Sequence, residues 1–214
     1  MLLNYYTIKQ DGDYEIVIKK SSFICHLRRI ETEDEAKEII QQIKKKHWKA
    51  NHNCVAYVLG DKQEIQRSSD DGEPSGTAGV PMLEVLKVKK LRNVLAVVTR
   101  YFGGTKLGAG GLIRAYSSSV SEAIEHIGLV EGKLQQEMIV TVDYSIHGKL
   151  EHFLTNHPEY TLSDTEFSDT VTLHIMVDEV SVTTFEESIT NLLNAQFSLK
   201  KGALDYCEVP INKS

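Results

Sequence analysis

The stretch VLAVVTRYFGGTKLGAGGLIRAYSSSVSEAIEHIG, residues 94–128, decides the fold of the first half of the chain. Its first eight residues are nearly all apolar and rich in β-branched side chains, which predicts a central strand buried on both faces. From Leu112 to Ile127 apolar residues recur at helical spacing, and Gly128 suits the C-terminal cap of that helix. The centre of this half is therefore predicted to be a strand that enters a helix through a glycine-rich loop.

Upstream, the sequence predicts more strands around another helix. Apolar stretches at 14–19 and 22–27 favour neighbouring strands, and HNCVAYVL at 52–59 favours a buried one. Thr32 and Glu35 form a capping box, which marks the start of a helix between these strands. Strands and helices in this mixed order predict an α+β fold.

The second half has its own order of elements. Strict alternation of apolar residues at 171–177 gives the cleanest strand signal in the chain. The full set is a strand from Met138, a helix from Ile146, a strand at 160–166, the strand at 171–177, a helix at 182–193 and a strand at about 197–206. This β-α-β-β-α-β order is that of the ferredoxin-like fold.

Charge divides the chain at a similar place. Residues 1–132 hold 19 lysines and arginines against 17 aspartates and glutamates, whereas residues 133–214 hold 5 against 13. The first part is thus slightly basic and the second acidic, within a net charge of −6. We therefore predict two domains, 1–132 and 133–214, and expect an anionic partner such as RNA to favour the first.

Composition also indicates in which cellular compartment the protein resides. There is no apolar run of about 18 residues, and the N-terminus lacks the pattern of a secretory signal, so we expect no membrane association. Cys25, Cys54 and Cys207 are odd in number and far apart, which argues against a zinc site or a disulfide framework. We interpret them as buried or half-buried thiols of a cytoplasmic protein.

The first segment that could carry chemistry lies in the turn-rich region 67–81, which precedes a short helix at about 80–86. It contains Asp70, Asp71, Glu73 and Ser75 in the sequence DDGEPSGT. Three carboxylates this close could hold Mg²⁺, or they could meet basic groups on a partner or on the glycine-rich loop. The same composition is typical of a polar turn that caps the next helix, and all three interpretations stay open.

The second candidate is the glycine-rich loop itself. Glycines let backbone N–H groups turn toward one point, and a helix N-terminus adds partial positive charge, as in a phosphate cradle. The pattern is neither a Walker motif nor a dinucleotide-binding fingerprint, and close packing of helix on sheet is the alternative explanation. The predicted anion- or partner-binding residues of this segment are Arg100, Tyr101, Gly103, Gly104, Lys106, Gly108, Gly110, Gly111 and Arg114.

A catalytic constellation is not visible. His52 and Cys54 are two residues apart on one predicted strand and would share a face, but an apolar strand favours a core role for both. The serines at 117–119 lie within a helix rather than on a nucleophile elbow. We therefore expect no catalytic residue, no metal site and no cofactor.

Three long segments together resemble the IMPACT family, bacterial YigZ type. They are HNCVAYVLG at 52–60, SSDDGEPSGTAGVPMLEVL at 68–86 and NVLAVVTRYFGGTKLGAGGLIRAYSSSV at 93–120. The resemblance implies a first domain similar to domain 2 of ribosomal protein S5. It also implies a ferredoxin-like second domain resembling a C-terminal domain of elongation factor G. Eukaryotic relatives are linked to translational control.

The resemblance thus implies a regulatory binding protein associated with translation. It would contact RNA, the ribosome or a ribosome-associated protein through residues 1–132. One alternative is a Mg²⁺-dependent small-molecule enzyme that binds phosphate or nucleotide with the glycine-rich loop and the DDGE segment. Another is a protein–protein adaptor that uses the DDGEPSG segment as its contact.

Overall fold

The computed structural model describes residues 2–194 and 196–211, so Met1 and residues 212–214 of the predicted domains lie outside the described residues. The chain forms two compact units. The first contains residues 5–131 and the described residues from Val209 onward, and the second contains residues 2–4 and the described part of 132–208. The predicted α+β class is confirmed.

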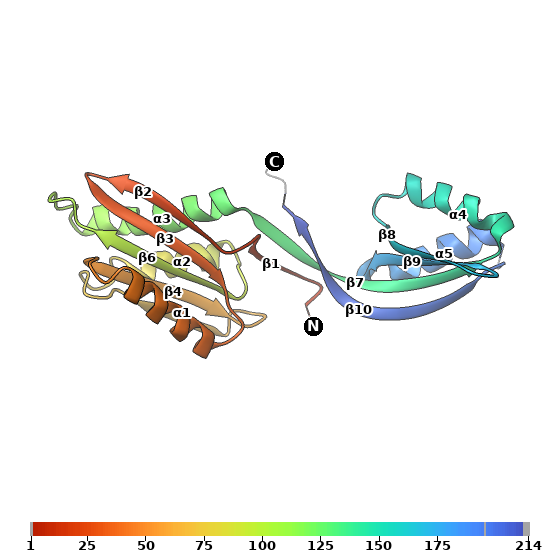
Figure 1. Cartoon of the computed structure of the whole chain (residues 1–214), viewed down its shortest axis with the longest axis horizontal. Coiled ribbons are helices and arrows are strands. Elements are labelled where there is room, and N and C mark those ends of the chain that lie inside the picture. The colour runs from red at the N-terminus through yellow and green to blue at the C-terminus, as the bar shows by residue number, and fades with distance from the viewer. Residues whose placement is uncertain (1, 195, 212–214) are drawn as a thin grey trace. The chain divides into compact units, whose positions relative to one another are not determined.

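The first unit is built on an antiparallel sheet (Figure 1). Its strands lie in the order β2 (Gly12–Ile18), β3 (Ser21–Arg29), β6 (Val94–Tyr101), β4 (His52–Leu59) and β5 (Ile65–Ser69). Helix α1 (Glu33–Lys46) packs on one face, and α2 (Gly79–Val88) and α3 (Ala109–Ile127) pack on the other. Strand β6 is apolar on both faces because helices cover both, as its sequence predicted.

The start of α1 confirms the predicted cap. The Thr32 hydroxyl accepts a hydrogen bond from the Glu35 N–H, at 3.1 Å. The Glu35 carboxylate in turn accepts from the Glu31 N–H, at 2.7 Å. The first bond satisfies a backbone donor that the first turn of a helix leaves free. The second bond holds the residue before the N-cap, so the reciprocal bond of the capping box is displaced by one residue.

The second unit follows the predicted β-α-β-β-α-β order. Its elements are β7 (Leu129–Val142), α4 (Tyr144–Asn156), β8 (Thr161–Phe167), β9 (Val171–Asp178), α5 (Val182–Leu193) and β10 (Ser198–Pro210). Strand β9 lies between β8 and β7 and is antiparallel to both, and β10 pairs with the other edge of β7. Strands β7 and β8 are therefore parallel and split by β9, which is the ferredoxin-like arrangement.

Two strands escaped the sequence analysis. Strand β5 overlaps the start of the region 67–81 that was interpreted as turns, and its residues IQRSS are mostly exposed because it forms an edge of the sheet. Strand β1 (Asn4–Ile8) pairs with β7. Among the helices of the described residues, none is both long and apolar enough to cross a membrane.

Candidate functional site

A cleft of about 460 Å³ opens where β6 leaves the sheet and α3 begins. In the register of the sheet, Arg100 lies opposite Phe23 on one neighbouring strand and opposite His52 on the other. The cleft brings together the DDGEPSG segment and the glycine-rich loop, which the sequence could not place relative to each other. Its lining residues are Asn51, His52, Glu73, Pro74, Arg100, Phe102, Lys106, Leu107, Gly108, Ala109 and Leu112.

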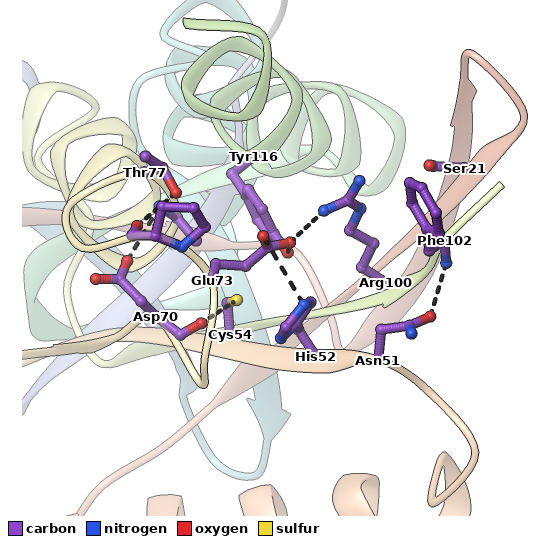
Figure 2. A network of polar contacts seen from close by, with 12 residues as sticks. Ser21, Asn51, His52, Cys54, Asp70, Glu73, Thr77, Arg100, Phe102 and Tyr116 are labelled. Carbon is purple, nitrogen blue, oxygen red and sulfur yellow. Dashed lines mark hydrogen bonds and ion pairs between the residues drawn. The ribbon is translucent and has the colours of Figure 1, made fainter. Parts of the chain in front are cut away.

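The floor of the cleft holds a buried ion pair, shown in Figure 2. Arg100 Nη1 donates to Glu73 Oε1 at 2.6 Å, and the two side chains are only 6% and 3% exposed. The Tyr116 hydroxyl donates to the same Oε1 at 2.8 Å. Burial, together with Cys54 and the Glu73 carboxylate, raises the pKa of Tyr116 and keeps it a neutral donor. The charge of Arg100 is thus neutralised by Glu73 instead of standing free for a ligand.

The guanidinium of Arg100 is also held by aromatic rings. Its Cζ lies 5.3 Å from the ring centroid of Phe23 and 5.5 Å from that of Phe102. Phe23 is fully buried, whereas Phe102 is 45% exposed at the wall of the cleft. Phe102 is fixed through its backbone, because its N–H donates to Asn51 Oδ1 at 2.8 Å. The cleft therefore presents an aromatic face on an ordered support.

His52 is the third polar group at the floor. Its Nδ1 lies 2.9 Å from the Asp71 carbonyl oxygen, which can only accept, so Nδ1 carries the proton. In the neutral ring, Nε2 is then an acceptor, 3.8 Å from Glu73 Oε2. The core role predicted for His52 is wrong, since the ring is half-buried and lines the cleft. Only the pairing of β4 with β6, which puts His52 beside Arg100, could have revealed this.

Cys54 behaves as predicted. It is buried, and its thiol donates to the Asp70 carbonyl oxygen at 3.0 Å. Burial raises its pKa to about 12, so it is no nucleophile. Cys25 is buried as well, but Cys207 is exposed, so the prediction of three buried or half-buried thiols is wrong for that residue.

The carboxylates of Asp70 and Asp71 hold the loop together. Asp70 accepts from the N–H groups of Gly76, Ala78 and Gly79, at 2.8, 3.1 and 2.8 Å, and thereby caps α2. Burial raises the pKa of Asp70, but these three donors outweigh it and hold that pKa below its usual value. Asp71 accepts from the Asn53 N–H at 2.7 Å and pairs with Lys44. Both carboxylates are engaged by groups of the protein itself, which favours the capping-turn interpretation of the loop.

The glycines of the glycine-rich loop are required for different structural reasons. A side chain at Gly103 would collide with the backbone of Lys20 and Ser21, which is the close-packing explanation. Gly104 and Gly108 have φ of +84° and +71°, where other residues are strained, and space around them is open. Gly108 is the N-cap of α3, and because glycine has no side chain it cannot accept a hydrogen bond from the first N–H groups of the helix.

The N-terminus of α3 consequently lies open at the cleft. The first backbone N–H bonded within the helix is that of Leu112, to the Gly108 carbonyl at 2.9 Å. The N–H groups of Ala109, Gly110 and Gly111 precede it and have no acceptor inside the helix. Lys106, on the loop just before them, is exposed and lines the same cleft. The cleft mouth therefore carries positive charge from a helix end and one lysine.

The predicted site residues separate into two groups. Glu73, Arg100, Lys106 and Gly108 line the cleft. Tyr101 belongs to the opposite face of the sheet, where its hydroxyl lies 2.9 Å from His47 Nδ1. Arg114 and Ser75 are exposed and do not line the cleft. The three cations of the predicted cradle have different places: Arg100 is buried and paired, and Lys106 lines the mouth. Arg114 does not line the cleft, although its Nη1 lies 3.9 Å from the Cβ position of Gly110 at the start of α3.

Comparison with known proteins places this site in a family. The profile of the Impact N-terminal domain matches residues 19–124, and a domain of unknown function, DUF1949, matches residues 140–196. The chain is 53% identical over 212 residues to IMPACT family member YvyE of Bacillus subtilis (strain 168), covering 99% of this chain and 97% of that protein. The chain belongs to the IMPACT family.

Other proteins match this IMPACT chain with lower identity. IMPACT family member YigZ of Escherichia coli (strain K12) is 43% identical over 112 residues, covering 51% of this chain and 55% of YigZ. A crystal structure of a hypothetical protein is 29% identical with a TM-score of 0.59, covering 93% of this chain and 97% of that one. The match to the structure of the two-domain translational regulator Yih1 has a TM-score of 0.36 and covers 57% of this chain and 46% of the Yih1 chain.

Proposed function

We propose that this IMPACT-family protein is a regulatory binding protein associated with translation, and that it binds RNA in the cleft of its first unit. The family likeness is the basis of the link to translation. The cleft supports an RNA ligand because it combines an aromatic face at Phe102, a lysine at position 106 and an open helix N-terminus. Aromatic stacking together with a positive groove is how proteins hold single-stranded nucleic acid.

The observation that carries this proposal is the open start of α3 beside Lys106. Backbone N–H groups at a helix N-terminus bind phosphate, and the nearby ammonium adds a full charge. The buried carboxylate of Glu73 does not cancel this charge, because Arg100 already neutralises it. The slightly basic first part of the chain also repels an anion less than the acidic second part does.

Salt-dependent binding tests the proposal. We expect the protein to bind a fluorescein-labelled single-stranded RNA 12-mer in an anisotropy titration, more weakly as salt rises. Lys106→Ala should weaken binding and lower the salt slope by about one, because one phosphate contact is lost. Lys45→Ala is the control, since Lys45 is an exposed lysine on α1, on the other face of the sheet. RNA binding that is absent at low salt, or equal sensitivity to both substitutions, contradicts the proposal.

The Mg²⁺-dependent enzyme is the weaker candidate. The bonds made by Asp70 and Asp71 count against it, because their carboxylates accept from backbone N–H groups. Thermal unfolding with Mg·ATP addresses it directly. A ligand at a hundred times its Kd should stabilise the protein by about 2.7 kcal/mol, and an unchanged Tm removes the candidate.

A further inference from the structure

The floor of the cleft contains an acceptor without a donor. Glu73 Oε1 receives the bonds from Arg100 and Tyr116. Glu73 Oε2 receives no hydrogen bond from any described residue, although the side chain is 97% buried by its 3% exposure. His52 Nε2 lies 3.8 Å from it, beyond hydrogen-bond distance, and the two groups form an ion pair when the ring is protonated. A buried carboxylate oxygen in this state is poised for a donor on a ligand.

His52 supplies a second acceptor of the same kind. When the ring is neutral, the Asp71 carbonyl fixes its proton on Nδ1, so that Nε2 presents its lone pair on the side of Glu73. In Figure 2 the His52 ring and the Glu73 carboxylate point toward each other beside Arg100. The floor thus offers two acceptors 3.8 Å apart, while the mouth offers the donors at the start of α3.

This distribution selects a ligand with donors at one end and an anion at the other. A ribose with free 2′- and 3′-hydroxyls carries two neighbouring donors, one for each acceptor. Its 5′-phosphate suits the open N-terminus of α3 and Lys106, and its base suits stacking on Phe102. A cleft of about 460 Å³ lies in the size range of small-ligand sites.

We propose that the cleft recognises a ribonucleotide with a free 2′,3′-diol, with Glu73 Oε2 and His52 Nε2 accepting the two hydroxyl hydrogens. In an RNA strand only the 3′-terminal nucleotide has this diol, so the protein binds RNA by its 3′ end. The inference rests on the proposed RNA-binding function. A free nucleoside 5′-monophosphate has the same diol and phosphate, and the experiment separates the two sources.

The test changes the ligand and leaves the protein intact. Four fluorescein-labelled 12-mers of one sequence are titrated: RNA with the 3′-terminal diol, RNA with a 2′-deoxy terminal residue, RNA with a 3′-phosphate, and RNA with a single internal 2′-deoxy residue. We expect the second and third to bind about tenfold more weakly, as for the loss of one good hydrogen bond in a buried site, and the fourth to bind as the first does. Equal binding of all four overturns the diol and leaves RNA binding in place.

Competition with AMP identifies the source of the ribonucleotide. If the labelled RNA binds and AMP displaces it more effectively than 2′-deoxy-AMP does, both proposals stand. If AMP binds with this diol preference while no RNA binds, the diol inference stands and the RNA-binding function is wrong. If neither RNA nor AMP binds, both are wrong.

Two variants connect the diol to named residues. His52→Leu removes one of the two acceptors. The affinity ratio between the RNA with a terminal diol and the 2′-deoxy RNA should therefore be much smaller for this variant than for the unchanged protein. Phe102→Ala should weaken all four RNAs alike, because stacking does not depend on the terminal hydroxyl. Unchanged discrimination in His52→Leu, with a folded protein by circular dichroism, overturns the assignment of Nε2.

Discussion

The two units of the molecule differ in what they bury. The first unit buries Glu73, Arg100 and His26 within its core. In the second unit, Gln135 and Gln136 are the only buried polar side chains among the described residues, and neither is charged. Removing charges from water costs free energy, so a core built for stability alone resembles the second unit. The buried ion pair of Glu73 and Arg100 lies at the cleft of the first unit, which is consistent with the ligand-binding role that we propose for it.

The largest expected effect comes from breaking the buried ion pair of the first unit. Arg100→Met should lower the free energy of unfolding by about 3–5 kcal/mol, because Glu73 is left as an unpaired buried charge. Chemical denaturation followed by circular dichroism measures the loss. The double variant Glu73→Leu with Arg100→Met should regain most of it and still lose the polar floor of the cleft.

An exposed ion pair of the second unit is the matched control. Lys201 Nζ lies 3.1 Å from Glu186 Oε1, with both side chains accessible to solvent. Lys201→Met should cost less than about 1 kcal/mol. If Arg100→Met lowers the free energy of unfolding no more than Lys201→Met does, then Glu73 is not left as an unpaired buried charge, and the contrast between the units is wrong.

A smaller effect separates the helix caps of the two units. Asp70→Ala should destabilise the first unit by about 1–2 kcal/mol, because α2 loses the oxygens that accept from Ala78 and Gly79. Ser181→Ala should change stability by less than about 0.5 kcal/mol, since Ser181 precedes α5 without forming a side-chain cap. Since the pKa of Asp70 is lowered in the folded state, its contribution is present above the unfolded pKa of about 4 and is lost as pH falls. Equal unfolding midpoints for the two variants contradict the cap.

The smallest effect concerns two histidine–carboxylate pairs. Burial lowers the pKa of His26 despite Asp13 at 2.9 Å, with Arg28 and His47 also opposing its charge. The Glu137 carboxylate accepts a hydrogen bond from His174 Nδ1 and thereby raises the pKa of His174 in the second unit. The His26 contribution to stability is complete above the unfolded pKa of about 6.5 and falls as pH drops below it. The His174 contribution is complete below about 6.5 and is lost as pH rises through the raised value.

Proton NMR titration of the two imidazoles measures this difference. We expect the midpoint of His26 below about 6.5 and that of His174 above it. Glu137→Gln should move the His174 midpoint down and leave the His26 midpoint in place. Coinciding midpoints in the unchanged protein would remove the contrast.

The sequence by itself determined the elements that follow local rules. Apolar spacing predicted β6, β9 and α3, and the capping box predicted the start of α1, because side chains close in sequence decide these features. Strand β5 was missed since an edge strand is polar and lacks the periodicity of a buried one.

Only the tertiary structure decided the site. Glu73 and Arg100 are 27 residues apart, and the pairing of β4 with β6 sets His52 beside Arg100. The sequence presents Arg100 as one of three cations near a glycine-rich loop, but the sheet buries it against Glu73 and leaves Arg114 outside the cleft. Burial and charge pairing are properties of contacts between distant segments, so a pattern of neighbouring residues cannot express them.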